Sequence, residues 1–361
     1  MSILQKVLIL DDQELQMSEY AASTVSRTGR PPPARPRYRW LRRSALAVVA
    51  ALTALGAVSV QQFFFGAAGV GHFRDAEGRR TYLAAYERAM SSLPSPTSTH
   101  DLATRFGTVR AYEWSSPDTA DTVPVVLVPG RSSGVPMWAE NLADFLPHRR
   151  VVAFDALGDA GLSVQNVPLA SFGDQAIWIA DALDALETDT VHIVGHSFGG
   201  AIAATYAQHF PERVRSLTLL EPVFTFAHPS ARMMAWTMVS TLPFLPESWR
   251  TAALGKVGGA EFDPNDDMAK MIAAGSEHFS AALPTPSPLS DDEMDALVMP
   301  TYVAIAERDS LAGAETAAQR ARTLPRATVD VVPNTTHSLP MQAKEILAVT
   351  LPAFWHESEQ S

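Results

Sequence analysis

The chain has 361 residues, of which 47% are hydrophobic and 19% are charged, and its formal net charge is −11. This length and apolar content suffice for one large globular domain or two smaller ones. The negative charge argues against a nucleic-acid partner. The chain has no cysteine, which excludes disulfides, thiolate metal sites and a cysteine nucleophile.

The first 43 residues include a basic, proline-rich segment that cannot build a core, and we expect residues 1–43 to be disordered. Its arginines are Arg27, Arg30, Arg35, Arg37, Arg39, Arg42 and Arg43. Met17 is an alternative to Met1 as the first residue, because a chain that began there would have a leader of ordinary polar composition.

Residues 44–71 contain no charged side chain and are long enough to cross a hydrocarbon layer of ~30 Å as a helix. Because the arginines precede this segment, the positive-inside rule places the N-terminus in the cytoplasm and the rest of the chain outside. We therefore expect a transmembrane helix that anchors an extracytoplasmic domain in the membrane. A cleaved signal peptide, which would release a secreted protein, is the alternative.

After a predicted helical linker over residues 72–99, with its helix at 79–90, strands and helices alternate from about residue 100 to 361. The predicted strands are 106–114, 123–128, 150–154, 190–194, 214–220, 301–305 and 327–332. The predicted helices are 137–146, 174–186, 201–209, 314–323 and 341–355. Strands separated by single helices indicate right-handed crossovers and a mostly parallel central sheet with helices on both faces.

The alternation stops between about residues 223 and 294, where no strand is predicted. This segment is rich in methionine and aromatic residues and is punctuated by proline. We predict a helical cap inserted over the carboxyl ends of the strands. Its apolar side chains line an adaptable substrate pocket or form the insertion's own core, and the sequence leaves both interpretations open.

The most informative motif is Gly195-His196-Ser197-Phe198-Gly199-Gly200, which follows an apolar strand and precedes a helix of small residues. In this strand–turn–helix context, G-x-S-x-G is typical of a nucleophile elbow, whose strained turn exposes the serine hydroxyl. The glycines let the helix pack close to the strand. Without that context the motif would indicate only a glycine-rich turn.

A serine hydroxyl needs a base to take its proton, and in open α/β sheets the partners must lie at carboxyl ends of strands. Of the ten histidines, His337 follows the last predicted strand and precedes the last helix, so it is the predicted base. By contrast, His192 lies within a strand and His196 within the elbow itself.

Two carboxylates at strand ends compete as the third catalytic residue. The chain order serine, aspartate, histidine favours Asp309, which follows the strand at 301–305. Glu221, after the strand at 214–220, is the alternative acid or a buried residue that binds loop backbone. Asp155 also ends a strand, but its glycine-rich context favours a loop-ordering role.

The oxyanion of an acyl-transfer intermediate requires two backbone N–H groups. The first is predicted at Phe198, next to the nucleophile at the positive end of a helix. The second is predicted at Arg131, in the loop after the strand at 123–128, with Ser132 as the alternative donor.

Over about residues 100–358 the chain resembles the α/β-hydrolase superfamily, in its serine-nucleophile form with a helical cap, and is similar to actinobacterial α/β hydrolases of unassigned substrate. The elbow carries this resemblance. The loop from Asp155 to Ser163 is similar to the family's Asp-x-x-Gly-x-G-x-Ser loop, with one residue more between its glycines. Pro129-Gly130 stands where many members have His-Gly. Relatives that open epoxides or displace halide have aspartate at the position of Ser197, which argues against those activities.

We therefore expect a serine hydrolase that cleaves carboxylic esters through Ser197, His337 and Asp309. The expected partner is a small ester with an apolar group, and the chemistry needs neither a metal nor an organic cofactor. Amide, lactone or carbon–carbon bond hydrolysis, cofactor-free haloperoxidation and acyl transfer use the same triad and remain alternatives. A membrane-anchored binding module without catalysis is the alternative outside enzyme function.

Overall fold

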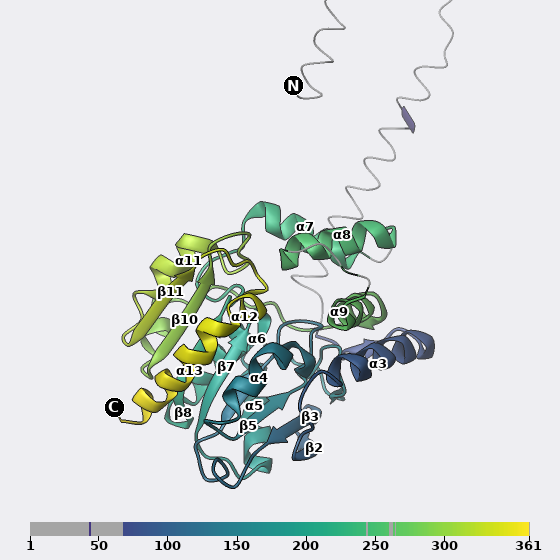
Figure 1. The fold of residues 1–361 in the computed structure, drawn as a ribbon. Coiled ribbons are helices and arrows are strands. Elements are labelled where there is room, and N and C mark those ends of the chain that lie inside the picture. Colours follow the sequence, from purple (N-terminus) through teal and green to yellow (C-terminus); the bar gives the residue numbers. More distant parts are fainter. Residues whose placement is uncertain (1–42, 45–67, 243–244, 260–262, 264, 361) are drawn as a thin grey trace, which may run out of the picture. The chain divides into compact units, whose positions relative to one another are not determined.

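The computed structural model describes residues 43–44, 68–242, 245–259, 263 and 265–360 (Figure 1). The chain divides into two units, Met1–Gln61 and Gln62–Ser361, and the fold below is that of the second unit. Nearly all of the predicted disordered segment and of the predicted membrane anchor lies outside the described residues. Of the helices that are described, none is both long enough and apolar enough to span a bilayer.

The core of the domain is a sheet with the strand order β11-β10-β8-β7-β4-β5-β3-β2, with β6 paired to β3 beside this path. The strands are β2 (Ser98–Thr104), β3 (Gly107–Trp114), β4 (Val125–Val128), β5 (Val151–Phe154), β6 (Val164–Gln165), β7 (Val191–His196), β8 (Val214–Leu220), β10 (Thr301–Ala306) and β11 (Ala327–Val332). Neighbours from β5 to β11 pair in parallel, whereas β2, β3 and β6 pair antiparallel. The prediction of a mostly parallel sheet is confirmed, and β2 and β6 are additions to it.

Helices cover both faces of this sheet, as predicted. One face carries α5 (Asp174–Ala185), α6 (Phe198–His209) and α11 (Ala314–Ala321). The other carries α4 (Ala139–Phe145), α12 (Leu339–Gln342) and α13 (Lys344–Glu359). Side-chain alternation explains the two cores, because Val126 and Val128 point to the first face whereas Val125 and Leu127 point to the second.

The insertion after β8 consists mainly of helices, which lie outside the sheet in Figure 1. They are α7 (Ala231–Thr241), α8 (Glu247–Gly258) and α9 (Asp267–His278), followed by the short α10 (Asp291–Asp295). The apolar side chains of this insertion divide between two environments. Phe226 and Met233 are buried in the core beneath it, whereas Trp236 and Trp249 are exposed.

The segment predicted as a helical linker contributes to the packing of this insertion. Its helix α3 (Ala76–Met90) buries Tyr82 and Tyr86 in a cluster shared with α9. Just before α3, the two-residue strand β1 (His72–Phe73) pairs antiparallel with β9 (Phe279–Ser280), which directly follows α9. The described chain therefore enters the domain beside the cap.

A buried histidine links the central sheet to the last helix. His192 of β7 is fully buried, and its Nδ1 lies 2.7 Å from the Ser216 hydroxyl. Its Nε2 lies 3.3 Å from Glu359 Oε1 near the end of α13. Burial lowers the pKa of His192 to about 4, and the charge of Arg149 adds to this effect although Glu359 opposes it.

This burial predicts an acid-sensitive fold. As pH falls below the ordinary histidine pKa of about 6.5, His192 is protonated in the unfolded chain. In the folded protein it stays neutral until the pH reaches about 4. His192 should therefore lower the free energy of unfolding by roughly 1.4 kcal/mol per pH unit across that window. Urea unfolding between pH 8 and pH 4 measures this slope. The variant His192→Asn, which cannot titrate, should have a shallower slope, and an unchanged slope would contradict the assignment.

Candidate active site

Ser197 lies on a turn that only close backbone packing can produce. It connects β7 to α6 with φ 55° and ψ −120°, outside the regions that L-residues favour. A Cβ atom at Gly195 would lie 2.3 Å from the Gly199 carbonyl oxygen, and one at Gly199 would lie 2.3 Å from that of Val128. Glycine at both positions therefore lets α6 approach β4 and β7 closely enough to hold the strained turn.

Strand register brings the other two residues of the site to the same edge of the sheet. His196 of β7 lies opposite Leu220 of β8, so Ser197 and Glu221 leave neighbouring strands side by side. The loop after β11 supplies His337. The Ser197 hydroxyl lies 2.8 Å from His337 Nε2, and His337 Nδ1 lies 3.1 Å from Glu221 Oε2.

This arrangement assigns the hydrogens. With Nδ1–H donating to the Glu221 carboxylate, His337 Nε2 has a free lone pair that accepts the hydrogen bond of the Ser197 hydroxyl. Glu221 is fully buried, and Ser197 and His337 are only 8% and 7% exposed. The three groups form the hydrogen-bonded chain that activates a serine nucleophile.

The two predicted oxyanion donors are free to act. In the described part of the chain neither the Phe198 amide nor the Arg131 amide donates to a protein acceptor. The alternative donor, the Ser132 amide, already donates to Asp159 Oδ2 at 2.7 Å. The Arg131 guanidinium stacks over the Phe198 ring, 5.6 Å from its centroid, so the two predicted donors belong to residues in direct contact.

Comparison with known proteins shows what this chain is similar to. A family model described as alpha/beta hydrolase fold matches residues 123–257, which include the elbow and Glu221. Carboxylesterase YbfK of Bacillus subtilis is 25% identical over 283 residues, which cover 76% of this chain and 93% of that protein. Its crystal structure superposes with a TM-score of 0.71 over 77% of this chain and 98% of that one, at 22% identity. Residues 123–257 therefore have the α/β-hydrolase fold.

One further relative matches over a shorter stretch of sequence, and one further solved structure matches over most of the chain. A 2-hydroxy-6-oxo-2,4-heptadienoate hydrolase of Pseudomonas putida is 43% identical over 107 residues, which cover 28% of this chain and 37% of that protein. The crystal structure of naproxen esterase from Bacillus subtilis has a TM-score of 0.71 at 22% identity, over 78% of this chain and 99% of that one.

The structure differs from the sequence-based preference for the acid. Asp309, which the sequence favoured, does not pair with the histidine; its carboxylate binds the guanidinium of Arg232 on α7 and is 40% exposed. Glu221, the alternative, occupies the position beside His337 Nδ1. The spacing along the chain could not decide this, because both residues end strands at the same edge.

The loop after β10 holds the Glu221 carboxylate in place. Oε1 accepts hydrogen bonds from the Ala306 amide at 2.7 Å and the Ser310 hydroxyl at 2.8 Å. Oε2 accepts one from the Leu311 amide at 3.1 Å as well as the one from His337. These donors fix the rotamer of Glu221, and through it the orientation of the imidazole.

A second histidine, which the sequence analysis set aside, supports the first. His196 Nε2 donates to the His337 carbonyl oxygen at 2.9 Å, and the two ring centroids are 4.9 Å apart. Burial, with a smaller effect from His337, lowers the pKa of His196 to about 3. His196 is therefore neutral at physiological pH and adds no positive charge beside the base.

Two buried aspartates order the oxyanion loop, as the sequence suggested for Asp155. Asp155 accepts hydrogen bonds from the Val135 amide at 3.0 Å and from the Tyr86 hydroxyl at 2.9 Å. Asp159 accepts the one from Ser132 described above. Burial raises the pKa of both carboxyl groups above the ordinary range. The Tyr86 hydroxyl thus connects helix α3 to Asp155, one of the two aspartates that order the oxyanion loop.

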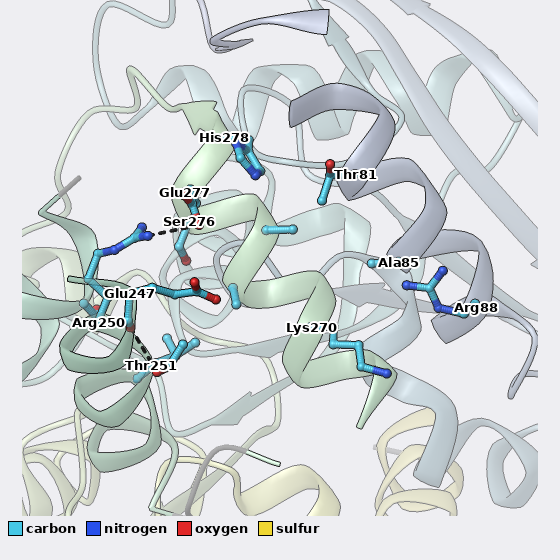
Figure 2. A pocket seen from close by; sticks show the side chains of 14 residues that line it. Thr81, Ala85, Arg88, Glu247, Arg250, Thr251, Lys270, Ser276, Glu277 and His278 are labelled. Atoms are coloured by element: carbon cyan, nitrogen blue, oxygen red, sulfur yellow. Dashed lines mark hydrogen bonds and ion pairs between the residues drawn. The ribbon is translucent and has the colours of Figure 1, made fainter. Parts of the chain in front are cut away.

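A cavity of about 340 Å³ lies away from this chemistry, between α3, α8 and α9 (Figure 2). Charged and polar side chains line much of it, and none of its lining residues belongs to the Ser197–His337–Glu221 chain. Within the described residues no cluster of three or more histidine, aspartate or glutamate side chains has the geometry of a metal site.

The two carboxylates can be distinguished by matched amide substitutions. Glu221→Gln should lower kcat/KM for a p-nitrophenyl ester by about 10³- to 10⁴-fold, because the amide cannot hold His337 in the Nδ1–H tautomer or stabilise the imidazolium. Asp309→Asn should change kcat/KM by no more than about three-fold, since it removes only an exposed ion pair. Thermal unfolding of both variants controls for loss of fold. The opposite order of effects would contradict the assignment of the acid.

Proposed function

We propose that this protein is a carboxylesterase that works through an acyl-enzyme on Ser197. The observation that carries the proposal is the continuous hydrogen-bonded chain from the Ser197 hydroxyl through His337 to the buried Glu221 carboxylate. The similarity to a carboxylesterase over 76% of the chain supports the same reaction class.

The proposed mechanism follows from these contacts. Ser197 Oγ attacks the ester carbonyl while His337 Nε2 takes its proton, and Glu221 stabilises the imidazolium that forms. The amides of Phe198 and Arg131 stabilise the oxyanion, with the N-terminus of α6 adding its positive potential. His337 then protonates the leaving alcohol. Water attacks the acyl-enzyme with His337 as base, which releases the acid and restores Ser197.

We also propose that the ester carries an apolar group. Two apolar residues are adjacent to the nucleophile: Phe198 follows it directly, and the Val223 amide donates to the Ser197 carbonyl at 3.1 Å. Beyond Val223 the chain continues into the methionine-rich and aromatic-rich insertion, whose composition suits an apolar substituent.

Replacing Ser197 with alanine tests the reaction class. Ser197→Ala should reduce hydrolysis of short p-nitrophenyl esters to background and abolish labelling by a fluorophosphonate, because no other group supplies the nucleophile. Ser240→Ala is the matched control, because it removes a buried serine hydroxyl that lies elsewhere, in α7. This variant should retain both ester hydrolysis and labelling. Residual hydrolysis by Ser197→Ala at the wild-type rate would refute the proposal. A panel of amides, lactones and carbon–carbon bond substrates then tests the other triad chemistries.

We further propose that residues 44–71 anchor the protein in a membrane and that the hydrolase domain is extracytoplasmic. The support is the uncharged stretch of 28 residues behind a cluster of arginines. The pairing of β1 with β9 means that such an anchor would join the domain on the side of the cap.

Cell fractionation tests the anchor. The full-length protein should sediment with membranes, resist extraction by alkaline carbonate and dissolve in detergent, because release requires the apolar helix to leave the bilayer. A mature protein that begins near Ala68 would instead support the cleaved signal peptide. Full-length protein in the soluble fraction of broken cells would contradict both.

A further inference from the structure

Helix α8 of the cap ends against the loop that carries the catalytic histidine. The carbonyl oxygen of Gly258, the last residue of α8, accepts hydrogen bonds from the Thr336 hydroxyl at 2.9 Å and the Ser338 hydroxyl at 2.7 Å. These two residues flank His337 on either side. The last carbonyls of a helix have no partner within it, so the histidine loop satisfies one of them.

The residue after α8 is shaped for this contact. Gly259 has a left-handed backbone with φ 75° and ψ 18°, a conformation that favours glycine. A Cβ atom at this position would lie 2.2 Å from Thr336 Oγ1 and 2.3 Å from Thr336 Cβ. Any side chain here would therefore push α8 and the histidine loop apart, independently of the backbone strain it would cause.

The remaining contacts of the loop come from the hydrolase core. The imidazole of His337 is held by Ser197 and Glu221, and its carbonyl by His196. The Thr336 amide donates to Gln342 Oε1 at 2.7 Å. The Thr336 hydroxyl also accepts a hydrogen bond from Gln342 Nε2 at 2.9 Å. The core thus holds the histidine and, through Gln342, one side of Thr336, and the cap adds the Gly258 carbonyl, to which both neighbouring hydroxyls donate.

Helix α8 is itself only lightly packed. Of its side chains only Arg250 and Ala253 are buried. Figure 2 shows Glu247, Arg250 and Thr251 of α8 along the cavity of about 340 Å³ between α8, α9 and α3, with Arg250 paired to Glu277 of α9 at 3.0 Å. An element with few buried contacts and open space beside it can move at little cost in free energy.

We propose that Thr336 and Ser338 are positioning residues that make the alignment of His337 depend on the seating of α8. The inference rests on the proposed esterase function and deepens it. When α8 is seated, Gly258 holds both sides of the histidine loop, and Nε2 faces the Ser197 hydroxyl. When α8 is displaced, the loop loses both bonds, and a shift of about 1 Å at the imidazole lowers the rate by about 10²-fold.

This coupling gives the cap a role in turnover. A substrate whose apolar group packs beneath the cap favours the seated position of α8, so part of its binding energy appears in kcat rather than in KM. A small ester that does not reach the cap loses this contribution. The cap therefore selects substrates by aligning the base as well as by shape.

The test removes the two hydroxyls and follows the steady-state kinetics of the full chain with a long-chain p-nitrophenyl ester. The double variant Thr336→Val, Ser338→Ala should lower kcat by about 10- to 100-fold with KM changed by less than about two-fold. Thr336→Ser should retain kcat, because it keeps the donor to Gly258. Thr251→Val is the matched control, since its hydroxyl bonds within α8 and does not touch the loop.

A double-mutant cycle separates this coupling from general damage. Gly259→Ala alone should lower kcat to a similar extent by displacing α8 from Thr336. Combining it with the hydroxyl deletions should then add little, because both changes break the same contact. The inference would be overturned if the two reductions in kcat multiplied in the combined variant. It would also be overturned if only KM changed, or if Thr336→Ser and Thr336→Val lowered kcat equally.

Labelling of the same proteins by a fluorophosphonate distinguishes failure of the proposed esterase function from failure of the proposed role of α8. Wild-type protein that neither hydrolyses esters nor accepts the label would refute the proposed function and this inference together. Wild-type protein that does both, with variants that match it in kcat and labelling rate, would refute only the role of α8. Slower labelling of the variants, with cooperative thermal unfolding retained, is the expected result.

Discussion

The close approach of α6 to β4 and β7 is the contact on which the site depends. It requires glycine at 195 and 199, where any side chain would meet a carbonyl oxygen at 2.3 Å. Once the helix is seated, Ser197 is held in its left-handed conformation, and the Phe198 amide comes to the helix N-terminus without an internal partner. The strain at one residue is thus stabilised by backbone packing around it.

Neighbouring strands supply and orient the carboxylate that pairs with His337. Glu221 leaves β8 beside Ser197, and it accepts hydrogen bonds from Ala306 at the end of β10 and from Ser310 and Leu311 in the loop that follows. That loop also carries Asp309, which turns outward to Arg232 of the cap. One loop therefore orients the carboxylate on its inner side and binds the cap on its outer side.

The cap contacts the hydrolase core at two loops that border the site. Arg232 at the start of α7 binds Asp309, and Gly258 at the end of α8 binds the loop of His337. Ser197 and His337 themselves are more than nine-tenths buried. Under the coupling proposed for α8, substrate selection and alignment of the base are properties of the same helices.

The sequence by itself determined the mostly parallel sheet, the elbow at Ser197, the histidine that meets it and the cap insertion, because each has a local signature in apolar runs, glycine spacing or strand ends. It missed β2, an edge strand in which only Leu102 is buried, since a half-exposed polar strand lacks an apolar run. Only the tertiary structure decided between Glu221 and Asp309, because both end strands at one edge and the choice depends on which side chain reaches His337 Nδ1. The contact of Gly258 with the histidine loop likewise joins residues about 80 positions apart, a separation that no local pattern encodes.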